Sequence, residues 1–378
     1  MSSPSDILVL AFQKASAQIA ESIVNDPEIV SRVEYVCRNI QNRAAVRLLL
    51  ACLLAKVHKP SIDIRKPYTQ IGDPDCYSGR TYDETYVTAF INEHDLPCNP
   101  TTAFLTPALR NRNIILTPDV NLVGRPPKLY QQVLQLLTDV YSNRVSSQTL
   151  LAETIRWLLI VRNEKRQRME SLLASLHFSE ATIPLSAEAV VGLIQQHIKC
   201  RGSSRLPVLV VASAYNTVSE RLGERILPLQ LHNAADEQTG ALGDLEITLI
   251  GEENVITSYE MKTKKVTLND IERALQKINV YSQKTGHNIQ NYIFITTDII
   301  DDNVKEYAAS LYEKTGGIEI VILDCIGFLR HFLHLFHRLR MQFIDNYQEL
   351  LLSEPESGVS QPLKEAFLAL RQAAESVE

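Results

Sequence analysis

The spacing of apolar residues changes along the chain, and the change falls near residue 200. Before that point, apolar residues recur every three or four positions, which is typical of amphipathic helices. The stretches with this spacing are residues 6–24, 29–57, 127–142, 147–173 and 186–199. Asn25 or Asp26 supplies a polar cap before the second stretch, and Pro60 ends it. We therefore expect a mainly helical N-terminal part.

Beyond residue 200, short runs of β-branched and apolar residues alternate with helical stretches. The predicted strands are "LPLQL" at 227–231, "DLEITLI" at 244–250, "NVITSYEMK" at 254–262, "NYIFITT" at 291–297 and "IEIVILD" at 318–324. The predicted helices are 207–226, 268–283, 302–314, 325–352 and 361–376. The resulting order, α-β-β-β-α-β-α-β, predicts a mixed α/β fold with a central sheet flanked by helices.

A long segment at 60–126, rich in Pro, Asn, Thr and Tyr, interrupts the helical pattern. Short helices are expected at 83–93 and 102–111, and loop elsewhere. Irregular segments of this length inside a compact protein are usually functional or disordered. The aromatic residues and short apolar runs argue against disorder. We therefore predict a helical domain at 1–200, which contains this segment, and an α/β domain at 201–378 with C-terminal helices.

Composition narrows the class of protein only a little. The chain of 378 residues has a net charge of −6, with 45% hydrophobic and 22% charged residues, which is ordinary for a globular protein. The acidic balance argues against unselective nucleic-acid binding but leaves room for a local basic cleft. We find no long apolar run and no basic N-terminal signal, so we expect neither a membrane span nor a signal peptide. Six scattered cysteines without paired spacing predict reduced thiols and a cytoplasmic location.

Candidate chemistry gathers in the stretch "GDLEITLIGEENVITSYEMKTKK". Asp244 begins one predicted strand, Glu260 lies near the end of the next, and alternation puts Glu260 and Lys262 on one face. A hairpin can bring Asp244 beside Glu260. Adjacent carboxylates repel unless a cation lies between them. Mg²⁺ prefers oxygen ligands and bridges to phosphate, and the carbonyl of Met261 is a further oxygen donor. The Lys262 ammonium can orient or activate water and stabilise developing charge.

On its own, an Asp…Glu-x-Lys pattern is more often a salt-bridged strand surface than a catalytic site. Three features of the surrounding sequence favour a catalytic site here. Predicted helices lie on both sides of the strands, Gly243 permits close approach of backbone and metal, and Lys264 adds positive charge where a phosphate backbone would pass. Glu246 is either an auxiliary ligand or a plain surface charge, and the surface charge is favoured.

The order of elements, with "GDLEI" and "YEMK" on the second and third strands, resembles the PD-(D/E)xK nuclease superfamily. The resemblance covers about residues 205–325, and the core it implies is α-β-β-β-α-β. It implies that Asp244 and Glu260 are metal ligands and that Lys262 is the catalytic lysine. Members often add an acidic residue from the preceding helix.

In this sequence the acidic residue of that helix is Glu220 or Glu224 in "SERLGERI". We prefer Glu220.

The segment at 60–126 is rich in side chains of the kind that contact DNA. Arginine can read guanine, asparagine can read adenine, and hydroxyl groups position phosphates. The candidate DNA-contacting residues are Arg65, Lys66, Tyr68, Arg80, Arg110, Asn111 and Arg112, with Lys264 from the second domain. The alternative is a hydrogen-bonded connector that holds two domains together, and both interpretations stay open.

The stretches "DIRKPYTQIG…SGRTYDETYV" and "HDLPCNPTTAFLTPALRNRN" are similar to type II restriction endonucleases of the SacI-like group. This similarity implies a DNA-recognition role for the helical domain, joined to a nuclease core.

Together these patterns predict a type II restriction endonuclease that uses Mg²⁺ to hydrolyse double-stranded DNA at a specific sequence, leaving 5′-phosphate ends. A palindromic target would be matched by a homodimer, and a cognate DNA methyltransferase would be the functional partner. Two alternatives stay open: a repair or structure-specific nuclease with the same core, and a DNA-binding or scaffold protein that does not cut. No phosphate-binding GxxxxGK[ST] motif is present, which argues against an ATP-driven enzyme.

Overall fold

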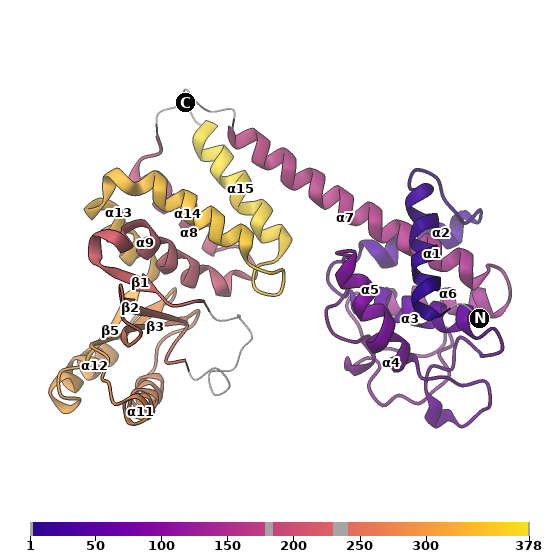
Figure 1. Cartoon of the computed structure of the whole chain (residues 1–378), viewed down its shortest axis with the longest axis horizontal. Helices are drawn as coiled ribbons and strands as arrows, with labels where there is room; N and C mark the ends of the chain where they lie inside the picture. Colours follow the sequence, from indigo (N-terminus) through magenta and orange to yellow (C-terminus); the bar gives the residue numbers. More distant parts are fainter. Residues whose placement is uncertain (1–2, 178–183, 230–240, 377–378) are drawn as a thin grey trace. The chain divides into compact units, whose positions relative to one another are not determined.

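The computed structural model describes residues 3–177, 184–229 and 241–376 (Figure 1). The chain divides into two compact units, 1–168 and 169–378. The predicted boundary at 200 falls inside the second unit, because the helix α8 (Ala187–Ile198) packs against helices of that unit. None of the helices in these ranges combines the length and apolar character needed to cross a membrane.

The first unit is helical, as predicted. Its helices are α1 (Pro4–Ala17), α2 (Pro27–Arg38), α3 (Ala44–His58), α4 (Gly79–Tyr82), α5 (Thr88–Glu93), α6 (Lys128–Tyr141) and most of α7 (Ser147–His177). Short 3₁₀ turns at Thr69–Ile71 and Ala103–Leu105 and a π turn at Asp83–Val87 complete it. Every residue of α3 from Ala44 to Ala55 is buried, so this helix forms the centre of the unit.

Three helix predictions in this unit are wrong. The helix expected at 6–24 ends seven residues early, because α1 stops at Ala17. The stretch 29–57 forms two helices, because the chain turns after Arg38: Asn39 is extended and its side chain accepts a hydrogen bond from the backbone of Asn42. Only a 3₁₀ turn forms within 102–111, where Pro107 cannot continue a helix. The predicted cap of α2 is Asp26, whose carboxylate accepts from the backbone of Glu28 and Ile29.

A buried ion pair ties the loop-rich segment to α3. The guanidinium of Arg47, with none of its surface exposed, binds the carboxylate of Asp83 and donates to the carbonyl of Asn99 at 2.6 Å. The same carboxylate accepts from the Thr102 hydroxyl at 2.6 Å and the Ala103 amide at 2.8 Å. One arginine therefore fixes two separate stretches of the segment.

The second unit is built on a five-stranded mixed sheet. Its strands are β1 (Glu224–Ile226), β2 (Leu245–Leu249), β3 (Val255–Lys262), β4 (Asn291–Thr296) and β5 (Glu319–Asp324). Its helices, besides α8, are α9 (Leu206–Leu222), α11 (Leu268–Thr285), α12 (Asp302–Lys314), α13 (Cys325–Leu335), α14 (Arg340–Ser353) and α15 (Gln361–Ser376). The strands lie in chain order; β1, β2 and β3 are antiparallel neighbours, while β3, β4 and β5 are parallel. The predicted mixed α/β fold is confirmed.

Different helices cover the two faces of this sheet. One hydrophobic core joins Leu245 and Tyr259 of the sheet to α8, α9 and the C-terminal helices. Another joins Tyr292 and Phe294 to α11 and α12. Figure 1 shows α9 and α14 on one side of the strands and α11 and α12 on the other. Because side chains alternate along a strand, Glu260 faces away from Tyr259, toward α11.

Three predicted elements in this unit differ from those observed. The helix expected to reach 226 ends at Gly223, whose φ of 70° is the left-handed conformation that closes helices. The first strand follows at once as Glu224–Ile226, so the strand predicted at 227–231 is misplaced; residues 230 and 231 lie outside the described residues. The long helix predicted at 325–352 is α13 and α14, separated by a 3₁₀ turn.

We expect Arg47→Met to destabilise the first unit by about 3–5 kcal/mol, because it leaves the Asp83 carboxylate buried without its cation. The free energy of urea unfolding measures this. Arg166→Met is the matched control, since the Arg166–Asp95 pair is exposed, with 56% and 78% of the side-chain surfaces in solvent; its cost should stay below about 1 kcal/mol. Equal losses in both variants would contradict the role assigned to Arg47.

Candidate active site

The candidate site lies at the end of β3, an interior strand of the sheet. Its neighbours fix its position on both sides: Tyr259 pairs with Leu245 of β2, and Glu260 and Lys262 pair with Phe294 and Thr296 of β4. The alternation of side chains puts Glu260 and Lys262 on the face covered by α11, as the sequence predicts.

The Glu260 carboxylate meets three groups from three elements. Oε1 lies 3.0 Å from the Lys262 ammonium, and Oε2 lies 2.9 Å from the Lys277 ammonium of α11. The Tyr292 hydroxyl of β4 donates to Oε2 at 2.8 Å. Burial acts to raise the pKa of Glu260, but Lys277 and Lys262 together outweigh it and hold the pKa below its usual range. Glu260 is therefore a carboxylate at neutral pH.

Lys262 is held between two acids. Besides Glu260, its ammonium lies 3.3 Å from Oδ1 of Asp270 in the first turn of α11. Thr267 caps this helix and donates to the Asp270 carboxylate, which keeps the acid in place. Burial acts to lower the pKa of Lys262. The carboxylates of Glu260 and Asp270 together have a larger, opposite effect, so the pKa lies above its ordinary value. In this arrangement Lys262 is a cation, suited to meet an anionic group.

Asp244 lies against the backbone of β3. Its amide donates to the carbonyl of Tyr259 at 2.8 Å, and its Oδ2 accepts from the amide of Met261 at 2.7 Å. Backbone groups alternate in direction along a strand, so the carbonyl of Met261 faces the same edge as its amide. The structure thus brings the Asp244 carboxylate beside the residue that separates Glu260 from Lys262.

Gly243 allows this approach. A Cβ at this position would lie 2.4 Å from the carbonyl oxygen of Tyr259 and 2.6 Å from Oγ of Ser258, both closer than real contacts. Any side chain would therefore push the start of β2 away from β3. The requirement is for space between two backbones.

Glu246 is not the surface charge that the sequence favours. It pairs with Ser258 of β3, is only partly exposed, and accepts a hydrogen bond from the amide of Leu242 at 2.7 Å. Burial raises its pKa. The Tyr292 hydroxyl contacts the carbonyl of Leu242 at 3.1 Å, so both side chains hold the segment that leads into Asp244.

Neither candidate helix acid lies at this end of the sheet. Glu220 is exposed in the last turn of α9, which covers the opposite face from α11. Glu224 belongs to β1 and pairs with Leu249, five residues along from Asp244, which is roughly 16 Å at about 3.3 Å per residue.

The groups that do reach Glu260 and Lys262 come from later in the chain: Lys277, Asp270 and Tyr292. The sequence contains a signal for two of them. Asp270 and Lys277 lie two helical turns apart, on one face of a helix predicted to pack against the strands.

Most candidate DNA contacts in the first unit already have partners in the protein. Arg65 pairs with Asp63 at 2.8 Å, and Arg80 pairs with Glu84 at 2.7 Å. The side chain of Arg112 donates to the carbonyl of Ala108 at 3.1 Å, and that of Tyr68 to the carbonyl of Leu109 at 3.0 Å. Across the described ranges, the exposed side chains of Arg110, Asn111 and Lys264 make no hydrogen bond or ion pair.

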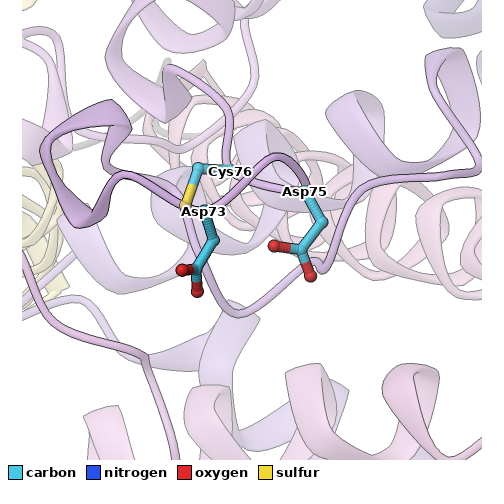
Figure 2. A group of neighbouring side chains, drawn as sticks. All are labelled: Asp73, Asp75 and Cys76. Carbon is cyan, nitrogen blue, oxygen red and sulfur yellow. The ribbon is translucent and has the colours of Figure 1, made fainter.

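Lys66 forms ion pairs with an acidic turn that contains Asp73, Asp75 and Cys76 (Figure 2). The ligand atoms of these three residues lie within 4.8 Å of one another, close enough to hold a metal ion. However, the Lys66 ammonium lies 2.8 Å from the Asp73 carboxylate and 2.9 Å from that of Asp75. The protein thus supplies its own cation here, and we assign this turn no metal.

Comparison of the sequence with protein-family models and with curated proteins found no match.

We expect Gly243→Ala to lower stability by about 1–3 kcal/mol, because the new methyl group overlaps the backbone of Tyr259. Gly192→Ala is the matched control: it lies within α8 and its Cβ would meet nothing within 4 Å. That variant should gain about 0.5–1 kcal/mol from the better helix former. Urea unfolding of both variants tests this, and a neutral Gly243→Ala would show that β2 and β3 do not need this close approach.

The lowered pKa of Glu260 predicts a pH-dependent contribution to stability. A carboxylate with a depressed folded pKa stabilises the protein above its ordinary pKa, 4.5, and loses that contribution as pH falls through the folded value. We expect Glu260→Gln to be destabilised relative to wild type at pH 7, with the difference shrinking below pH 4.5. Urea unfolding across this range, with the exposed Glu349→Gln as control, measures it. A difference that does not change with pH would contradict the charge pairing.

Proposed function

We propose that the protein is a nuclease that hydrolyses phosphodiester bonds of double-stranded DNA in the presence of Mg²⁺, as a type II restriction endonuclease does. The observation that carries this proposal is the grouping at the end of β3. There the Glu260 carboxylate lies 3.0 Å from the Lys262 ammonium, and the Asp244 carboxylate accepts a hydrogen bond from the amide of Met261, the residue between them.

The order of elements supports a nuclease core of the PD-(D/E)xK type. The helix α9, the antiparallel strands β1, β2 and β3, the helix α11 and the strand β4 follow one another as α-β-β-β-α-β. Asp244 directly precedes the second of these strands, and the Glu-x-Lys triplet ends the third, next to where the resemblance expects the acid and at the place where it expects the triplet. We take this agreement in order and position as support for the core, and the residue chemistry as support for the activity.

The donor set suits Mg²⁺. Asp244 and Glu260 offer carboxylate oxygens, the Met261 carbonyl faces the edge where Asp244 binds, and hard divalent cations prefer such oxygen ligands. Glu260 is kept ionised by Lys262 and Lys277, so it needs no deprotonation to act as a ligand. When bound, Mg²⁺ would supply Lewis-acid polarisation of a phosphoryl oxygen and a lower pKa for a coordinated water.

The protein's own residues then have separate tasks. Lys262, a cation, can donate to a phosphoryl oxygen and offset the negative charge that grows there during attack. Lys277 maintains charge balance on Glu260 when Lys262 turns toward the substrate. In the overall reaction, water attacks phosphorus, the bond to the 3′ oxygen breaks, and 5′-phosphate and 3′-hydroxyl ends result.

Several finer expectations belong to the same proposal. Sequence-specific cutting of a palindrome would call for a homodimer, a cognate DNA methyltransferase would protect the host, and a cytoplasmic location would bring the enzyme to its substrate. A repair or structure-specific nuclease would use the same site on a different DNA.

One observation favours a second candidate function, a DNA-binding protein that does not cut. Both oxygens of Glu260 are already neutralised by ammonium groups. Such a network is stable without a metal ion, as in a structural strand surface.

Incubation of the protein with unmodified plasmid DNA, with and without Mg²⁺, tests the proposal. We expect discrete fragments with Mg²⁺ and none with EDTA. Asp244→Asn keeps an acceptor for the Met261 amide but removes the charge, and Lys262→Ala removes the cation. Each should slow cleavage by about 10²–10³-fold, the usual cost of losing one group that stabilises transition-state charge.

The control is Lys284→Ala, which removes an exposed lysine from the last turn of α11; its cleavage rate should stay within about twofold of wild type. Unchanged cleavage by both Asp244→Asn and Lys262→Ala would overturn the assigned roles. Smeared or branch-dependent products would point to a structure-specific nuclease. A folded wild-type protein that binds DNA but never cuts it would support the non-cutting alternative.

A further inference from the structure

A small polar pocket opens within the loop-rich segment of the first unit. Its volume is about 150 Å³, and its lining comes from the turns around Tyr68, Ser78, Phe104 and Arg110. This is below the roughly 300 Å³ at which sites for whole small molecules begin. The pocket therefore suits one small planar or anionic group, and it is too small for an entire cofactor.

The floor of the pocket is firmly built. The Tyr68 hydroxyl donates to the carbonyl of Leu109 at 3.0 Å, and the rings of Tyr68 and Phe104 meet edge to face at 5.9 Å. A Cβ on Gly79 would come within 2.4 Å of the Phe104 ring, so these turns pack without spare room. Asp83, the partner of Arg47, fixes the chain directly before Phe104. The pocket is thus held open by rigid parts.

The rim of the pocket carries polar groups that the protein does not use. Gln70, Arg110, Asn111 and Asn113 all line it, and their side chains are exposed. Within the part of the chain that the structure describes, none of these side chains makes a hydrogen bond or ion pair. Among the residues that the structure describes, no carboxylate lines the pocket. In contrast, Arg65 and Lys66 nearby are neutralised by aspartates.

The kinds of side chain on the rim indicate the ligand. Three carboxamides each present a donor and an acceptor side by side, and Arg110 presents a fork of donors. Arginine pairs bidentately with guanine, and carboxamides pair bidentately with adenine. A site for phosphate alone needs donors and gains nothing from the amide oxygens. The combination therefore favours base edges.

We propose that the polar rim of this pocket reads base edges of double-stranded DNA, with Arg110 as its central contact and Gln70, Asn111 and Asn113 as supporting contacts. The proposal rests on DNA being the substrate at the β3 site. It adds a second, separate site that selects the sequence. Arg65 and Lys66, which are engaged within the protein, take no part in base reading.

Selection from a pool of random 30-base-pair duplexes in EDTA tests the pocket independently of cleavage. We expect wild type to enrich a preferred sequence. Arg110→Ala should bind that sequence about tenfold more weakly than wild type, lose preference at one or two positions, and bind random duplexes with nearly unchanged affinity. Gln70→Ala should show a smaller loss of the same kind. The control, Lys14→Ala, removes the same charge from an exposed position on α1 and should leave the preference intact.

Three results would overturn the pocket proposal. Equal weakening of Arg110→Ala on preferred and random duplexes, with a shallower salt dependence, would mark a phosphate contact. Unchanged binding by this variant would mean no DNA contact, and a wild type that enriches no sequence would mean no base reading. If the wild type selects a sequence through Arg110 but does not cut DNA with Mg²⁺, the base-reading proposal is supported and the proposed nuclease activity is contradicted.

Discussion

A carboxylate removed from water must be met by positive charge or hydrogen bonds, and Glu260 is met by Lys262, Lys277 and Tyr292. These groups come from β3, α11 and β4, so satisfying one partly buried acid fixes how the helix lies on the sheet. The same contacts keep Glu260 ionised and Lys262 protonated. The structural requirement and the proposed chemistry therefore coincide: charges that hold the unit together are those that a divalent cation and a phosphate would engage.

The two proposed sites depend on different constraints. At β3 the constraint is close approach of two strands, which Gly243 permits and which lets Asp244 reach the backbone of Met261. In the first unit the constraint is the buried ion pair of Arg47 and Asp83. This pair ties distant turns to α3, while other polar groups stay at the surface. In both places rigid packing holds the candidate side chains in position.

Much of the second unit was predictable because its strands are short apolar runs, separated by turns and helices. Helix α12 was placed at its observed bounds. The roles of Asp244, Glu260 and Lys262 depend on their spacing together with the superfamily resemblance, and they stay a prediction. Contacts made between elements were not predictable. Lys277 reaches Glu260 only through the packing of α11, and Glu246 is partly covered by a segment whose path the sequence does not reveal. The predicted helix end was wrong where a single residue, Gly223, changed the backbone conformation.

The central claim is that Asp244 and Glu260 hold a divalent cation, and metal binding tests it most directly. Mn²⁺ accepts the same oxygen ligands as Mg²⁺ and can be followed by its electron paramagnetic resonance signal. Titration of wild type with Mn²⁺ should show a bound ion, and Glu260→Gln should weaken that binding at least tenfold. Binding of equal strength in both proteins, or none in wild type, would contradict the account.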